Sequence, residues 1–149
     1  MPGADDNGHY VTNLRNLAKK YNVLGKMVFL PFLDDLPAAY MLADVVVAPS
    51  LKPEPFGRVI IEAQAMGRPV ISFDHGGASE SIKNNITGLL VEPKNEKELG
   101  NAIEKLINMT EMQRNKMANR SRKHIVNNFS LDKMNKETIK LYSEVLKIK

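Results

Sequence analysis

Short apolar runs alternate with amphipathic segments along the chain as far as Pro93. Three of these runs, MVFLP, DVVVA and PVISF, are apolar nearly throughout, which is typical of strands buried on both faces of a parallel sheet. The segments between them carry apolar residues at spacings of three and four, as amphipathic helices do. This alternation predicts a doubly wound α/β layer. The predicted elements are helices over 10–22, 34–42, 57–66 and 79–84, and strands over 27–31, 44–48, 69–73 and 88–91.

The remainder, 94–149, is predicted to be the helical C-terminal part of the same domain. Asn95 with Glu98, and Thr110 with Gln113, have the spacing of a capping box at a helix start. Ser130 is a candidate cap for a last helix with an apolar face. That face carries Leu131, Met134, Leu141, Val145 and Ile148.

Composition narrows the class of protein. The chain has 149 residues, of which 43% are hydrophobic and 26% charged, so one globular domain over residues 1–149 is expected. No apolar run approaches the roughly 18–20 residues of a membrane span, and the first residues lack the pattern of a signal peptide. The absence of cysteine excludes disulfides, thiolate zinc sites and cysteine nucleophiles. A cytoplasmic protein is therefore expected.

Charge is unevenly distributed. The net charge of +4 combines −2 over residues 1–93 with +6 over 94–149. The basic residues of the second part alternate with acidic and amide residues, which favours a solvated helical face. Nucleic-acid binding is not expected because aromatic residues are not interleaved with the basic ones. Contact with an anionic membrane, at its inner face, stays open as an alternative.

Two carboxylates stand out in the segment PSLKPEPFGRVIIEAQAMGRPV. Glu54 is expected in the loop beyond a strand, and Glu62 lies eight residues later in the following helix. The free backbone N–H groups of that helix start lie between them and can bind an anion. A phosphate flanked by two carboxylates that accept hydrogen bonds from hydroxyl groups describes a nucleotide-sugar site.

Taken alone, the two glutamates also fit a charge at a helix start beside a surface residue. Two observations favour a site. Glu62 lies in the apolar stretch VIIEAQAM, where an unpaired carboxylate is costly. The loop DHGG at the end of the next strand lets a ligand approach the backbone closely at Gly76 and Gly77. For His75, exposure to solvent is expected, and contact with a ligand is the alternative.

Several blocks together resemble the C-terminal, donor-binding domain of GT-B-fold retaining glycosyltransferases of the family 4 type. The resemblance covers most of the chain in order and spacing. The matching blocks are ADVVVAPS (43–50), EPFGRVIIEAQAMGRPVI (54–71), DHGGASESI (74–82), TGLLVEP (87–93), NFSLDKM and LYSEVL.

The resemblance implies roles for individual residues. Glu54 would be the catalytic residue and would bind hydroxyl groups of the donor sugar, and Glu62 would hold the ribose. The backbone amides of Phe56, Gly57 and Arg58 would cradle the sugar and the diphosphate. The remaining donor-binding residues implied are Val59 beside the nucleotide, the loop around Phe32 beside the base, and Gly76 and Gly77.

The family also implies a mechanism that needs neither a metal ion nor a cofactor, and no Asp-x-Asp signature occurs in the sequence. The diphosphate of a nucleotide-sugar would leave, and an acceptor hydroxyl would attack the same face of the anomeric carbon. A hexosyl transfer in lipopolysaccharide or other cell-envelope glycan synthesis is expected.

The resemblance predicts an incomplete Rossmann-like three-layer sheet, the C-terminal half of a GT-B fold without its first strands. The N-terminal acceptor-binding domain would then be a missing partner, and the chain would be inactive alone. Because the last helix crosses toward that domain in the family, the resemblance also implies that its apolar face is partly uncovered. Three situations stay open: a separate chain supplies the missing part, the remaining strands pair directly, or exposed sheet edges lead to instability or homo-oligomers. The alternative functions are a non-catalytic remnant or subunit that pairs with an acceptor-domain chain, and another GT-B activity.

Overall fold

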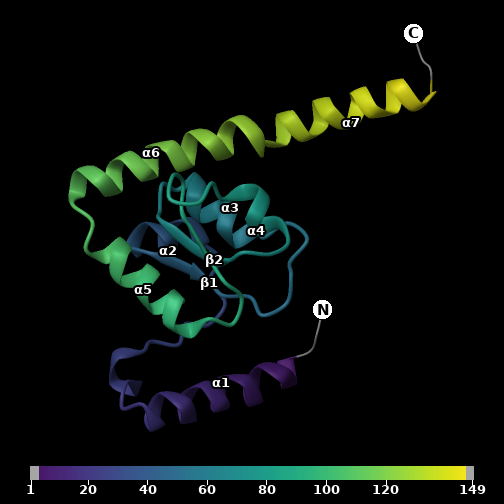
Figure 1. Ribbon diagram of the computed structural model, residues 1–149. Coiled ribbons are helices and arrows are strands. Elements are labelled where there is room, and N and C mark those ends of the chain that lie inside the picture. Colours follow the sequence, from purple (N-terminus) through teal and green to yellow (C-terminus); the bar gives the residue numbers. More distant parts are fainter. Residues whose placement is uncertain (1–3, 147–149) are drawn as a thin grey trace. The chain divides into compact units, whose positions relative to one another are not determined.

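The computed structural model describes residues 4–146 and divides the chain into two compact units, Met1–Asp34 and Asp35–Lys149. The first unit contains helix α1 (Ala4–Lys20) and the short 3-10 helix η1 (Leu24–Lys26) (Figure 1). The helix predicted over 10–22 is therefore present but begins earlier. The guanidinium of Arg15 lies 4.4 Å from the centre of the Phe29 ring, which connects α1 to the segment after η1.

The prediction of a strand over 27–31 is wrong, because this segment pairs with no described strand. Met27, Val28 and Leu30 are exposed. Apolar character favours burial, but a strand also needs a neighbour that satisfies its backbone groups, and the described part of the chain provides none here. The alternative that this segment pairs directly with the strand predicted over 44–48 is therefore also wrong.

The other three predicted strands are present in the second unit. They are β1 (Val46–Ala48), β2 (Val70–Phe73) and β3 (Leu89–Val91), which form a parallel sheet in the order β1-β2-β3. Val47 lies opposite Ile71, and Ile71 opposite Leu89. Parallel neighbours require crossover connections, which the intervening helices provide.

Helices precede, separate and follow the three strands along the chain, as the alternating pattern predicted. They are α2 (Leu36–Leu42), α3 (Arg58–Ala65), α4 (Gly77–Ser81), α5 (Glu96–Ile107), α6 (Glu111–Asn128) and α7 (Leu131–Leu146).

The predicted caps are largely confirmed. Thr110 and Gln113 form the full capping box of α6, and the Ser130 hydroxyl accepts from Lys133 N at 3.3 Å. The Asn95 side chain accepts from Glu98 N at 3.0 Å, but the Glu98 carboxylate bonds elsewhere. Of the capping box predicted at Asn95 and Glu98, only the bond to the Asn95 side chain therefore forms.

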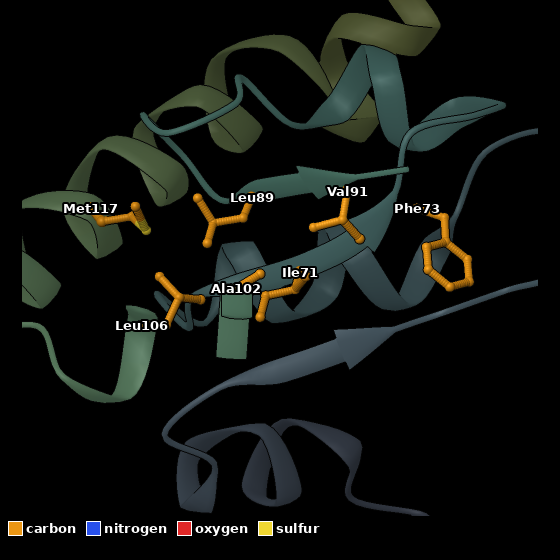
Figure 2. Close-up of a cluster of buried hydrophobic side chains, with 7 residues drawn as sticks. All are labelled: Ile71, Phe73, Leu89, Val91, Ala102, Leu106 and Met117. Carbon is orange, nitrogen blue, oxygen red and sulfur yellow. The ribbon is translucent and has the colours of Figure 1, made fainter. Parts of the chain in front are cut away.

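The core consists of two clusters on opposite faces of the sheet. Along β2, Ile71 and Phe73 face one cluster and Val70 faces the other, as the alternation of side chains in a strand requires. Ala102 and Leu106 of α5 cover the first face (Figure 2). The second cluster joins Val70 to side chains of α2, α3 and α4, namely Tyr40, Ile60, Ala63 and Ala78, and to Ile82. The predicted three-layer arrangement is therefore confirmed.

The two edges of the sheet differ. At the β3 edge, the Asn84 side chain accepts from Leu90 N at 3.1 Å, and the Glu98 carboxylate accepts from Glu92 N at 2.9 Å. These side chains occupy backbone donors that another strand would use. At the other edge, β1 has no strand on its outer side within residues 4–146.

The last helix, α7, has no buried residue, which agrees with the expectation of an uncovered apolar face. Leu131, Met134, Leu141 and Val145 are all exposed, and Ile148 lies outside the described residues. Among helices between residues 4 and 146, none combines the length and apolar character that crossing a membrane requires.

Candidate functional site

Two loops meet at the carboxyl ends of β1 and β2, backbone against backbone. Gly77 N donates to Glu54 O at 2.8 Å, which joins the DHGG loop after β2 to the loop after β1. A Cβ atom on Gly77 would lie 2.7 Å from Phe56 Cα and O, and one on Gly76 would lie 2.5 Å from Glu54 O. These approaches are open only to residues without a side chain. The structure thus brings the predicted residues of both loops into one place.

The start of α3 presents unoccupied backbone donors beside these loops. Gly57 caps this helix in the left-handed conformation, with φ 73°, and supplies no side-chain hydrogen bond. The N–H groups of Gly57, Arg58 and Val59 have no acceptor among the described residues. A helix leaves its first N–H groups unpaired, and the helix dipole adds positive potential at this end. This cluster can therefore bind an anion.

Glu54 is exposed at the rim of the site and is held by Ser50. The Ser50 hydroxyl donates to Glu54 Oε1, and the carbonyl of Ser50 accepts from His75 Nε2 at 2.9 Å. The expectation that His75 faces solvent is wrong, because its ring is partly buried and its Nδ1 atom is fully covered. The carboxylate of Glu54 keeps free lone pairs that can accept from ligand hydroxyl groups.

Glu62 lies one turn into α3, and both of its oxygens have partners. Arg58 donates to Oε1 from Nε at 3.2 Å and from Nη2 at 2.9 Å. The Tyr40 hydroxyl donates to Oε2 at 3.2 Å. Burial, and secondly the charge of Glu62, raise the pKa of Tyr40 above 10.0. Because these partners satisfy Glu62, a carboxylate in the stretch VIIEAQAM does not by itself require a ligand.

Phe56 connects the site to the C-terminal helices. Its ring lies 6.2 Å from the ring of Phe129, between α6 and α7, and Phe129 in turn packs edge-on against His124 at 5.6 Å. Burial, and secondly the charge of Lys83, lower the pKa of His124 below 6.5. The block NFSLDKM, far from the site in sequence, thus supports the loop that carries Glu54.

Nearly all of the predicted donor-site residues gather in the second unit. The exception is Phe32, which belongs to the first unit and is 89% exposed. Its assignment to base binding stays a prediction. Sequence reasoning missed Tyr40, which no local motif marks, and Ser50, although Ser50 ends the matching block ADVVVAPS. The position of His75 beside two glycines also offered a signal. The predicted residues that lie together are Glu54, Phe56, Gly57, Arg58, Val59, Glu62, Gly76 and Gly77.

Known proteins share both the sequence and the fold. A D-inositol 3-phosphate glycosyltransferase of Salinispora tropica is 33% identical over 137 residues, which cover 91% of this chain and 28% of that protein. A glycosyltransferase structure from Rickettsia africae matches 95% of this chain and 38% of its own, with 33% identity and a TM-score of 0.89. The Anabaena protein Alr3699/HepE, in a complex with UDP-glucose, matches 97% of this chain and 38% of its own, with 30% identity and a TM-score of 0.86.

These matches share the GT-B Rossmann-like fold that the sequence predicted. The chain spans about a third of the length of the curated relatives it matches. The family model for glycosyl transferases group 1 matches residues 3–124, which is most of the chain. The chain therefore belongs to the glycosyl transferases group 1 family.

Proposed function

We propose that this chain binds a nucleotide-sugar donor at the start of α3 and contributes the donor side of a retaining glycosyl transfer. The observation that carries the proposal is the row of unoccupied N–H groups at Gly57, Arg58 and Val59, flanked by the carboxylates of Glu54 and Glu62. The complex of Alr3699/HepE with UDP-glucose supports this ligand class.

Each part of the donor has a matching group. The diphosphate carries negative charge, which suits the N–H groups and the dipole of α3. The sugar hydroxyls can donate to Glu54, which is exposed and already oriented by Ser50. The ribose hydroxyls can donate to the remaining lone pairs of Glu62, whose side chain is 32% exposed.

In the transfer, the bond between the anomeric carbon and the diphosphate oxygen breaks, and the electron pair leaves with the diphosphate. The acceptor oxygen bonds to the same face of that carbon, and its proton passes to the departing diphosphate on that face. Charge develops on the leaving diphosphate, where the fixed N–H groups of α3 would stabilise it most. An acceptor site, supplied by a longer protein or a second chain, is part of this proposal.

Titration of the full 149-residue chain tests donor binding directly. NMR spectra of the ¹⁵N-labelled chain are recorded with UDP, UDP-glucose and GDP-mannose, each up to about 10 mM. We expect saturable shifts at Gly57, Arg58 and Val59 with at least one of them. For a sugar nucleotide that binds, we expect a loss of affinity of roughly tenfold in Glu54→Ala and in Glu62→Ala, since each loses hydrogen bonds to a charged acceptor.

Glu104→Ala is the matched control, because Glu104 is an exposed glutamate of α5 and should leave affinity unchanged. The proposal fails if none of the three compounds produces saturable shifts at the start of α3. It also fails if Glu54→Ala binds the sugar nucleotide as tightly as Glu104→Ala does.

A further inference from the structure

We infer that His75 is a positioning residue that holds the carboxylate of Glu54 through Ser50. The inference rests on the proposed donor site, where Glu54 faces the sugar. His75 Nε2 lies 2.9 Å from the carbonyl oxygen of Ser50, although 25 positions separate the two residues. A carbonyl oxygen only accepts, so Nε2 carries the hydrogen of this bond.

The His75 ring is held in one orientation. It is partly buried, and the ring of Phe73 packs edge-on against it with 6.3 Å between the centres. The nearest acidic group in sequence, Asp74, instead accepts from the hydroxyl of Ser79 at 2.7 Å. The Nε2 bond to Ser50 is thus the one hydrogen bond of the ring within the described structure, because Nδ1 is buried without a partner.

Ser50 transmits this restraint to the carboxylate. Its carbonyl is fixed by His75, and its hydroxyl donates to Glu54 Oε1. The backbone of Glu54 is held independently, because its carbonyl accepts from Gly77 N at 2.8 Å. The DHGG loop therefore restrains Glu54 twice, at the backbone directly and at the carboxylate through Ser50.

Such a restraint matters because Glu54 lies in an exposed loop between Pro53 and Pro55, which have no N–H groups to anchor it. A glutamate side chain has several rotatable bonds, and ordering it before the ligand arrives lowers the cost of binding. The chemical class that benefits is the hexosyl group of a sugar nucleotide, whose hydroxyls donate to the carboxylate. The nucleotide part, which is proposed to bind at α3 and Glu62, gains nothing from His75.

Three variants of the full chain separate this role from a general one in folding. The amide nitrogen of His75→Gln can occupy the place of Nε2, whereas His75→Asn is too short to reach Ser50 and His75→Ala has no donor. We expect His75→Ala and His75→Asn to bind UDP-glucose about fivefold more weakly, as for the loss of one hydrogen bond. UDP affinity should stay within about twofold in all three, and His75→Gln should bind UDP-glucose within about twofold of the wild type.

A second measurement needs no ligand. ¹⁵N relaxation should give backbone order parameters of about 0.85 for Leu51 and Lys52, which follow Ser50, in the wild type and in His75→Gln, and below about 0.6 in His75→Ala. The Glu54 backbone should stay ordered in all of them, because Gly77 N holds its carbonyl independently. Equal order in all variants overturns the inference, and so does an equal loss of UDP and UDP-glucose affinity in His75→Ala. If the wild type binds no nucleotide, the proposed function fails, and the relaxation result alone decides the role of His75.

Discussion

Replacement of Gly77 by alanine probes the contact between the two site loops. A Cβ atom at this position would lie 2.7 Å from Phe56 Cα and O and 2.8 Å from Phe56 C, all of them backbone atoms. Ordinary contact begins at 3.4 Å, so the Phe56 backbone would have to retreat by about 0.7 Å. Such a shift would stretch the 2.8 Å bond between Gly77 N and Glu54 O to about 3.5 Å, where it is essentially lost.

The expected loss of stability in Gly77→Ala follows from these two effects. Overpacking against backbone costs about 1–3 kcal/mol, and the loss of one hydrogen bond costs about 1 kcal/mol. We therefore expect Gly77→Ala to lower the free energy of unfolding by about 2–4 kcal/mol. For a chain of this length that corresponds to a fall in melting temperature of about 6–12 °C.

Thermal melts followed by circular dichroism at 222 nm measure this difference. Gly100→Ala is the matched control, because Gly100 lies inside α5 and an added Cβ would meet nothing within 4 Å. In an exposed helix interior, alanine is more stable than glycine by about 0.5–1 kcal/mol, so this variant should melt higher than the wild type. A Gly77→Ala variant that melts within about 2 °C of the wild type would refute the close contact between the loops.

Three further substitutions test individual interactions. Tyr40→Phe removes the hydroxyl that donates to Glu62 and should cost about 0.5–1.5 kcal/mol. Because folding raises the pKa of Tyr40 above 10.0, its hydroxyl stabilises the fold fully below pH 10, and this stabilisation is lost as the pH rises through the folded-state pKa. Between pH 9 and 11, the free energy of unfolding from urea titrations should therefore fall less in Tyr40→Phe than in the wild type. Folding lowers the pKa of His124 below 6.5, so the neutral ring stabilises the fold above that pH, and this stabilisation is lost on acidification. Between pH 7 and 5, His124→Gln should therefore lose less free energy of unfolding than the wild type. An equal loss would contradict the burial of this ring. Arg58→Ala breaks an ion pair whose arginine side chain is 83% exposed, so urea titration should find a change within about 0.5 kcal/mol, and a loss well above 1 kcal/mol would contradict the screened pair.

Sequence patterns predicted the parts of the fold that depend on local signals. The runs that became β1, β2 and β3 are largely apolar, and those of β1 and β2 contain β-branched residues. The polar residues Thr110 and Ser130 cap the helices that follow them. The segment 27–31 has the same local character as the other strands and yet forms none. Strand formation depends on a neighbour, and a single sequence does not indicate whether that neighbour is present.

The candidate site shows the same division. Glu54, Glu62 and the glycines of the DHGG loop were predicted from their spacing and residue type, whereas Phe56, Arg58 and Val59 were implied by the resemblance to the family. Their supporting contacts were not predicted. Tyr40 reaches Glu62 across 22 positions, and His75 reaches Ser50 across 25, so no periodicity or short motif reports them. The contact between the tilted rings of Phe129 and Phe56 likewise spans more than seventy positions and arises from packing alone.

Because the two edges of the sheet differ, an added strand would pair more readily at one edge than at the other. Asn84 and Glu98 hold the outward N–H groups of Leu90 and Glu92, so a strand arriving beside β3 would have to displace two hydrogen bonds before forming any. No described strand occupies the outer side of β1. Any further strand would therefore meet a lower barrier at β1, and assembly would be steered to the side of the sheet whose loop carries Glu54.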